Sequence, residues 1–212
     1  MEKQDVQKAL AELKKEPARK FAQAYDLVIN LKNISIKQNP VDFFAVLHYS
    51  RGRKIKVAAF VDQQLADQAT KHCDLVIRET DFVKYADKKV GKQLAREYDY
   101  FIAQATIMPK VAAAFGKSLG TSGKMPNPKL GCVVPPNANL EPLVSKLTKT
   151  VRLSAKKGTN LQCMVGKQSQ PEEEIIDNIL TVYQQTLKQL PNESQNVKDV
   201  ALKLSMSKPV RI

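Results

Sequence analysis

The chain has 212 residues, of which 43% are hydrophobic and 26% are charged, a composition typical of folded proteins and too apolar for a disordered chain. Its 34 basic and 21 acidic side chains give a net charge of +13, which favours polyanionic partners such as nucleic acid. The cysteines are widely spaced, no long apolar run occurs and the N-terminal segment is charged, so we expect a cytoplasmic protein without disulfides, bound metal, membrane partner or secretory signal.

The N-terminal quarter combines one helix with two strands. Apolar residues at helical spacing predict a helix over 3–15. β-rich segments predict strands over 25–31 and 43–49. The basic run 51–54 is typical of a connector.

Strands and helices alternate through the middle of the chain. Strands are predicted over 56–61, 74–77 and 100–104, and helices over 63–72, 87–98, 108–119 and 140–149. This alternation predicts a parallel sheet with helical crossovers, which is an α/β arrangement.

The last third returns to hairpins and a long helix. Strands are predicted over 151–155, 161–165 and 197–206, and a tail over 208–212. The loop 156–160 joins the first two strands as a hairpin. Ser169 to Glu172 matches a capping box at the start of an apolar-striped helix.

This change of pattern predicts two domains. Residues 55–149 form the α/β unit, and the outer segments 1–54 and 150–212 form one discontinuous domain. Only strands shared between the two outer segments would hold the discontinuous domain together.

No pattern in the chain indicates an enzyme. Gly123-Lys124 lacks the earlier glycine and the following Ser or Thr of a phosphate-binding loop. His72 and Cys73 are adjacent, and adjacent residues on a strand point to opposite faces. Glu172 to Glu174 suit the positive end of a helix better than a carboxylate pair. We therefore predict no catalytic residues.

The most specific segment is LGTSGKMPNPKL at 119–130, a loop in which prolines restrict the backbone and glycines allow tight turns. It closely resembles the signature of the ribosomal protein L1 family of the large-subunit stalk, which usually has an Arg and often a Pro where Thr121-Ser122 stand. The resemblance covers essentially the whole chain, at the length of archaeal members. Further matching segments are 20–21, 26–32, 51–54, 101–109, 136–139, 165–167 and 204–206.

The resemblance implies an α/β fold class, α+β overall. A discontinuous split β-α-β domain from both termini would bind RNA, and a Rossmann-like three-layer α/β domain would be inserted into it. Their expected bounds are 1–54 with 150–212, and 55–149.

The resemblance also implies the function. It implies a structural constituent of the large ribosomal subunit that binds 23S-type stalk ribosomal RNA, supports release of deacylated exit-site tRNA, and represses translation of its own mRNA. We expect no cofactor and a monomeric free protein. The expected RNA contacts are Lys20, Phe21, Asp26, Lys37, Gly166, Lys167, Ser205, Met206 and Ser207. A second candidate RNA surface consists of Lys117, Lys124 and Lys129.

Several of these positions have competing interpretations. From the residues alone, a core side chain at a strand entry is the better interpretation of Phe21. Ser207 stands where the family has glycine, and Asp199 stands where many members have serine, which predicts weaker RNA binding.

Two alternative functions stay open at this point. One is a ribosome-biogenesis RNA-binding protein on the same scaffold. The other is a small phosphate-handling α/β enzyme that uses Lys117 and Lys124 against a polyanion.

Overall fold

A computed structural model describes residues 1–17, 19–35, 39–85, 87–155 and 158–212, so the expected RNA contact Lys37 lies outside the described residues, as does part of the hairpin loop 156–160. The chain divides into two compact units. The terminal unit comprises Met1–Arg53 and Lys149–Ile212, and the inserted unit comprises Lys54–Thr148. The inserted unit thus begins and ends one residue earlier than the domain 55–149 expected from the sequence.

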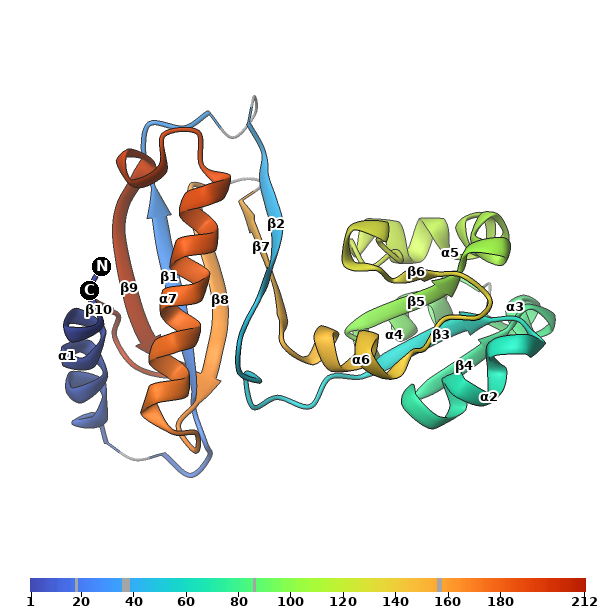
Figure 1. Cartoon of the computed structure of the whole chain (residues 1–212), viewed down its shortest axis with the longest axis horizontal. Coiled ribbons are helices and arrows are strands. Elements are labelled where there is room, and N and C mark those ends of the chain that lie inside the picture. Colours follow the sequence, from blue (N-terminus) through green and yellow to red (C-terminus); the bar gives the residue numbers. More distant parts are fainter. Residues whose placement is uncertain (18, 36–38, 86, 156–157) are drawn as a thin grey trace. The chain divides into compact units, whose positions relative to one another are not determined.

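The terminal unit is built on an antiparallel sheet in the order β10-β9-β1-β8 (Figure 1). Its central strand β1 comes from the N-terminal segment, and both of its neighbours come from the C-terminal segment. A second pair, β2 with β7, again joins the two segments. The strands are β1 (Ala24–Leu31), β2 (Val41–Val46), β7 (Thr150–Ala155), β8 (Asn160–Lys167), β9 (Val197–Leu204) and β10 (Val210–Arg211).

The helices α1 (Lys3–Lys14) and α7 (Glu172–Gln189) pack against this sheet, and their apolar side chains share one hydrophobic core with it. The strict alternation of β1 explains this layering, since its residues alternate between buried and half-buried positions. Leu27 and Ile29 lie in the core with Leu10 and Ile179 from the helices. The other face of β1 is only half buried.

Five local predictions for this unit were wrong. The two strands predicted as a hairpin lie in different sheets, since β7 pairs with β2 and β8 pairs with β1. The strand predicted over 43–49 is displaced to Val41–Val46, the segment that pairs with β7. The strand predicted over 197–206 ends at Leu204, where a turn begins. The predicted tail contains β10, which pairs with β9. Ser169 does not cap α7, which has Pro171 at its N-cap position.

The inserted unit has a parallel sheet in the order β4-β3-β5-β6. All five residues of β3 are buried, so both of its faces are covered, as the parallel arrangement requires. Its elements are β3 (Val57–Val61), α2 (Gln63–His72), β4 (Leu75–Arg78), α3 (Phe82–Tyr85), α4 (Lys88–Glu97), β5 (Tyr100–Gln104), α5 (Met108–Thr121), β6 (Val133–Val134) and α6 (Glu141–Thr148).

An aromatic cluster forms the core between this sheet and α3, α4 and α5. The Phe60 ring lies 4.9 Å from Phe115, 5.8 Å from Phe82 and 5.8 Å from Phe101 between centroids. The mixture of helices and sheets confirms the predicted α/β fold class. Among the described residues, we find no helix with the length and apolar character needed to cross a membrane.

Candidate nucleic-acid interface

Three chain segments meet at one end of the terminal sheet, around the buried side chain of Gln23. Gln23 Oε1 accepts a hydrogen bond of 3.1 Å from the Met206 amide. The Gln23 carbonyl accepts one of 3.0 Å from the Gln168 amide, and Gln168 Oε1 accepts one of 3.3 Å from the Gln23 amide. We call the side chains gathered here the strand-end surface: Lys20, Phe21, Lys167, Ser205 and Met206.

The turn after β9 is held in place by its own hydroxyl groups. Ser205 Oγ accepts a hydrogen bond of 3.1 Å from the Ala24 amide, which fixes the turn to the start of β1. Ser207 Oγ accepts a hydrogen bond of 2.9 Å from the Leu204 amide, and the Ser207 amide donates to the Leu204 carbonyl over 3.2 Å. Ser207 has no positive φ, so this turn does not require the glycine that the family resemblance led us to expect.

Two large apolar side chains project from the strand-end surface. Phe21 is 54% exposed and Met206 is 64% exposed. The interpretation of Phe21 as a core residue is therefore wrong. Lys20, immediately before Phe21, is also exposed. Exposed apolar side chains beside a cation fit a partner that offers both flat hydrophobic faces and negative charge.

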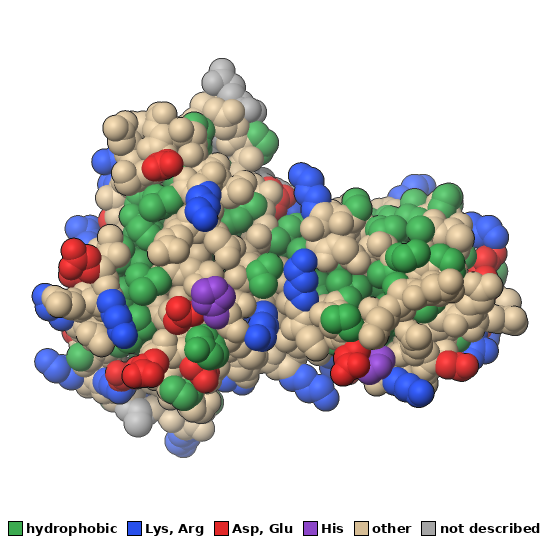
Figure 2. All heavy atoms as spheres, in the orientation of Figure 1, with side chains coloured by type: hydrophobic (Ala, Val, Ile, Leu, Met, Phe, Trp, Pro, Cys, Tyr) green, Lys and Arg blue, Asp and Glu red, His purple; other side chains and the backbone are tan. Residues whose placement is uncertain are grey.

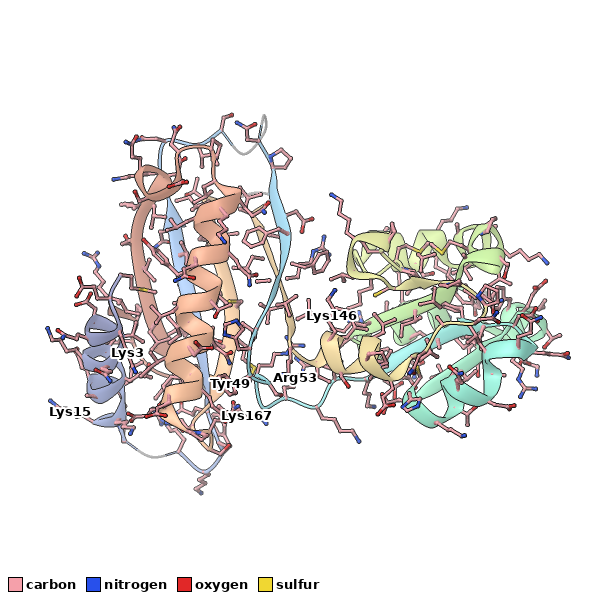
Figure 3. The ribbon with its side chains drawn as sticks, viewed as in Figure 1. Lys3, Lys15, Tyr49, Arg53, Lys146 and Lys167 are labelled. Carbon is pink, nitrogen blue, oxygen red and sulfur yellow. The ribbon has the colours of Figure 1, made fainter. Side chains whose placement is uncertain are left out.

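The end of β8 contributes one packing residue and one cation. Gly166 is buried, and a Cβ there would lie 3.0 Å from Ile175 Cγ1, so it allows β8 to approach α7 closely. Its neighbour Lys167 is half-buried, and its Cγ lies 3.4 Å from where a Cβ of Gly52 would be. Figure 3 shows Lys167 and Tyr49 at the same end of the terminal unit.

Gln170 links this end to the basic connector. Its Oε1 accepts a hydrogen bond of 2.9 Å from the Lys167 amide, and its Nε2 donates to the Ser50 carbonyl over 2.7 Å. The connector that carries Arg51 and Arg53 is thus held against the end of β8. This arrangement adds positive charge beside the strand-end surface.

The expected contact Asp26 lies on the half-buried face of the sheet. It pairs across the strands with Met164 on one side and Lys203 on the other. Burial raises the pKa of the Asp26 carboxyl, and the positive charge of Lys203 partly offsets that rise. Asp26 therefore neutralises part of the charge of Lys203 on this face.

The three lysines of the second candidate surface come from different parts of the inserted unit. Lys117 lies on α5 and is exposed, and Lys129 is exposed in the short helical turn Pro128–Leu130. Lys124 Nζ instead donates a hydrogen bond of 2.7 Å to the Tyr98 carbonyl. Lys124 thus stabilises its own loop, whereas Lys117 and Lys129 present their ammonium groups to solvent.

Sequence reasoning missed Gln23 and Gln168, which hold the strand-end surface together. Gln23 is only 2% exposed, although glutamine usually lies at the surface. The only sequence signal is its position two residues after Phe21, at the entry to a predicted strand. Its partner Met206 is 183 positions away in the sequence, so no local pattern could have indicated the pairing.

The chemistry of the described residues does not suggest catalysis. Burial raises the pKa of Cys73 and Cys132 to about 11 and that of Cys163 to about 12. These thiols therefore stay protonated at neutral pH, and a protonated thiol is a poor nucleophile. No grouping of His, Cys, Asp and Glu that could hold a metal ion occurs in the part of the chain that the structure describes.

The face of the terminal unit that carries α7 intersperses acidic and basic side chains (Figure 2). His48 and Asp177 meet there, with 2.6 Å between Nδ1 and Oδ2. Lys14 on α1 forms an ion pair with Glu172. Such a mixed surface offers no continuous positive field, which favours the strand ends over the helical face as a site for a polyanion.

Comparison with known proteins places these observations in a family. Residues 13–208 match the model of the Ribosomal protein L1p/L10e family. The Large ribosomal subunit protein uL1 of Nanoarchaeum equitans is 37% identical over 198 residues, which cover 92% of each chain. The proteins of the same name from Methanothermococcus thermolithotrophicus and Pyrococcus abyssi are 35% and 34% identical. Both alignments span 100% of this chain, and they cover 99% and 96% of the relatives.

Proposed function

Because this chain belongs to the ribosomal protein L1 family, we propose that it is a constituent of the large ribosomal subunit that binds the 23S-type ribosomal RNA of the stalk. The members of this family are structural, non-enzymatic proteins, and this chain likewise is not an enzyme. The phosphate-handling enzyme is thereby set aside. The sedimentation experiment below distinguishes the ribosomal role from a biogenesis role on the same scaffold.

One observation carries the proposal. Gln23 holds the exposed side chains of Phe21 and Met206 at the same end of the terminal sheet. RNA loops offer splayed bases and ribose faces that apolar side chains can cover. We propose the strand-end surface as the site that meets the stalk RNA, with Ser207 supporting its turn.

Positive charge would supply affinity for the RNA, and the shape of the turn would supply recognition. Lys20, Lys167 and the arginines of the connector would neutralise phosphates and release counterions, so the affinity would depend steeply on salt. The Ser205 and Met206 turn would read the shape of the RNA through its backbone and hydroxyl groups. Asp26, beside Lys203, would limit the charge of the neighbouring sheet face.

Two further roles belong to the proposal. With the second unit joined through two connections, the protein would support the release of deacylated tRNA from the exit site, and Lys117 and Lys129 would contact that tRNA. A similar RNA structure on its own mRNA would compete for the strand-end surface and so repress its translation. Both roles place the protein in the cytoplasm, on ribosomes.

A filter-binding titration tests RNA recognition. Stalk RNA should bind tightly, and the logarithm of the affinity should fall linearly with the logarithm of the salt concentration. An unrelated hairpin of equal length is the control and should bind more weakly at every salt concentration. Equal affinity for the two RNAs would overturn the proposed recognition.

Sedimentation separates the ribosomal role from the biogenesis role. A constituent of the ribosome should remain with mature large subunits after a high-salt wash. A biogenesis protein should instead sediment with precursor particles and be absent from mature subunits. The second result would replace the proposed function with the alternative.

A further inference from the structure

The half-buried face of the terminal sheet contains a hollow of about 420 Å³, apart from the strand-end surface. Four strands contribute to it, and its floor is made by the small apolar side chains Val28 and Ala201, which are cross-strand partners. The lining residues are Val28, Asn30, Gln162, Asp199, Ala201, Lys203, Pro209 and Arg211. Ligand sites commonly combine an apolar lining with a few polar groups that fix the orientation of the ligand.

The walls of this hollow differ chemically from one end to the other. Asp199 and Asn30 lie opposite each other at one end, and Lys203 is four residues further along β9. At the rise of a strand this separates the Cα atoms of Asp199 and Lys203 by about 13 Å. Arg211 lies between them, opposite Ala201. An acceptor end therefore faces a cationic end across a span that suits a purine.

At the acceptor end, one hydrogen bond between Asn30 and Asp199 fixes the orientation of both side chains. Asn30 Nδ2 donates to Asp199 Oδ1 over 2.5 Å, which is the hydrogen bond the described residues provide for this carboxylate. Asp199 Oδ2 and Asn30 Oδ1 are left as acceptors for a ligand. Two adjacent acceptors favour a ligand with two adjacent N–H donors and disfavour one that places a lone pair there.

We propose that this hollow binds an unpaired guanine of the RNA and selects it over the other three bases, an inference that rests on the proposed RNA-binding function. Guanine presents adjacent donors at N1 and N2 to the two acceptors Asp199 Oδ2 and Asn30 Oδ1. Its adjoining Hoogsteen edge presents the acceptors O6 and N7, which suit Arg211 and Lys203. Adenine and cytosine place a ring lone pair beside their amino group, and uracil has a single N–H donor between two carbonyls. Asp199 thus determines which base is bound, in addition to repelling RNA phosphates.

Mononucleotides test the base preference on the full-length protein. In NMR titrations with GMP, IMP, AMP, CMP and UMP, GMP should shift the backbone amides of 28–30 and 199–203. It should saturate these shifts at concentrations about tenfold or more below those of AMP, CMP and UMP. IMP, which lacks the N2 amino group, should fall between GMP and AMP. Equal saturation by all five nucleotides would overturn the proposal.

The Asp199→Asn variant separates base recognition from general charge. It should lose the preference for GMP by about tenfold, because an amide donor then faces the N–H donors of guanine. Asp67→Asn is the matched control, since it makes the same charge change at an exposed position on α2 of the inserted unit and should leave the preference intact. A simple anion site would show the opposite result, with tighter GMP binding to Asp199→Asn than to the parent protein.

Filter binding with stalk RNA distinguishes this inference from the function it rests on. Asp199→Asn should weaken stalk RNA binding, although it makes the protein more positive. Tight stalk RNA binding without any preference for GMP would refute the guanine site alone. A preference for GMP without stalk RNA binding would refute the proposed function. It would also show that the guanine does not come from RNA and would indicate a site for free guanine nucleotides.

Discussion

The backbone amide of Met206 donates a hydrogen bond of 3.1 Å to the side-chain oxygen of Gln23, across a sequence separation of 183 residues. Together with the hydrogen bonds between Ser205 and Ala24, this bond joins the turn after the last long strand to the entry of the first strand. Because both segments also carry an exposed apolar side chain, these bonds decide where the candidate RNA surface lies.

Replacing Met206 or Phe21 by Ala should weaken stalk RNA binding by about tenfold each, because each residue would cover a base or ribose face. Stability should change little, since 64% of Met206 and 54% of Phe21 is already exposed. Filter binding and thermal unfolding measure the two effects. Val83→Ala is the control, because Val83 is an exposed apolar residue of the inserted unit and should leave affinity unchanged. Unchanged affinity in both test variants would refute the placement of the surface.

Replacing Gln23 by Leu should destabilise the terminal unit by about 1–2 kcal/mol, because the Met206 amide loses its partner in a half-buried position. RNA affinity should fall as well, since the hydrogen bond that positions the Met206 amide would be lost, although Ser205 still joins the turn to Ala24. Gln23→Glu keeps an acceptor oxygen and serves as the control for RNA affinity, whereas its stability also reflects the burial of a carboxylate. Urea unfolding and filter binding report the two quantities. A stable Gln23→Leu protein with full RNA affinity would show that the hydrogen bond does not position Met206.

The close approach of α4 and α5 gives a prediction about the inserted unit. A Cβ at Gly91 would lie 2.5 Å from Ser118 Oγ and 2.8 Å from Ser118 Cβ, so Gly91→Ala should cost about 1–3 kcal/mol. Hydrogen exchange over 88–119 should accelerate accordingly. The double variant Gly91→Ala with Ser118→Gly should recover part of the loss by making room. Additive losses in the double variant would contradict the steric explanation.

Asp26 gives a pH-dependent prediction. Its pKa is raised in the folded protein, so folding is favoured most when the carboxyl is protonated, below pH values near its unfolded pKa of about 4. That contribution is lost as the pH rises through the folded pKa, and the ionised group is mildly destabilising at neutral pH. Asp26→Asn should therefore raise stability at pH 7 by a few tenths of a kcal/mol, reduced by solvent screening. The difference should vanish at low pH, and urea unfolding at pH 3 and pH 7 checks the sign.

Limited proteolysis tests the proposed domain division. Cleavage near 51–54 and 149–150 should release the inserted unit, while the two outer pieces stay associated because β1 lies between β8 and β9. Gel filtration after cleavage separates the outcomes. Dissociation of the outer pieces from each other would contradict the proposed discontinuous domain.

Most elements of the fold could be predicted from local patterns. The alternation of β1 and the strand and helix repeat of the inserted unit are strong periodic signals, and both are seen in the structure. The errors concern ends and short elements, where pairing with a distant strand decides the outcome. The segment 210–211 becomes a strand only because β9 offers it an edge. The predicted capping box also fails, because α7 begins one residue after Pro171 and Ser169 lies outside its first turn.

The α/β class and the positive charge could be read from composition, periodicity and local motifs, because these properties do not depend on distant contacts. Which of the expected RNA contacts lie together depends instead on how the strands pair. Phe21 and Met206 share one end of the sheet, and Asp199 lies beside Asn30, because antiparallel pairing of β9 with β1 fixes a register between distant segments. No local pattern encodes that register, since it is set by the burial of one strand face and the hydrogen bonds at both strand ends.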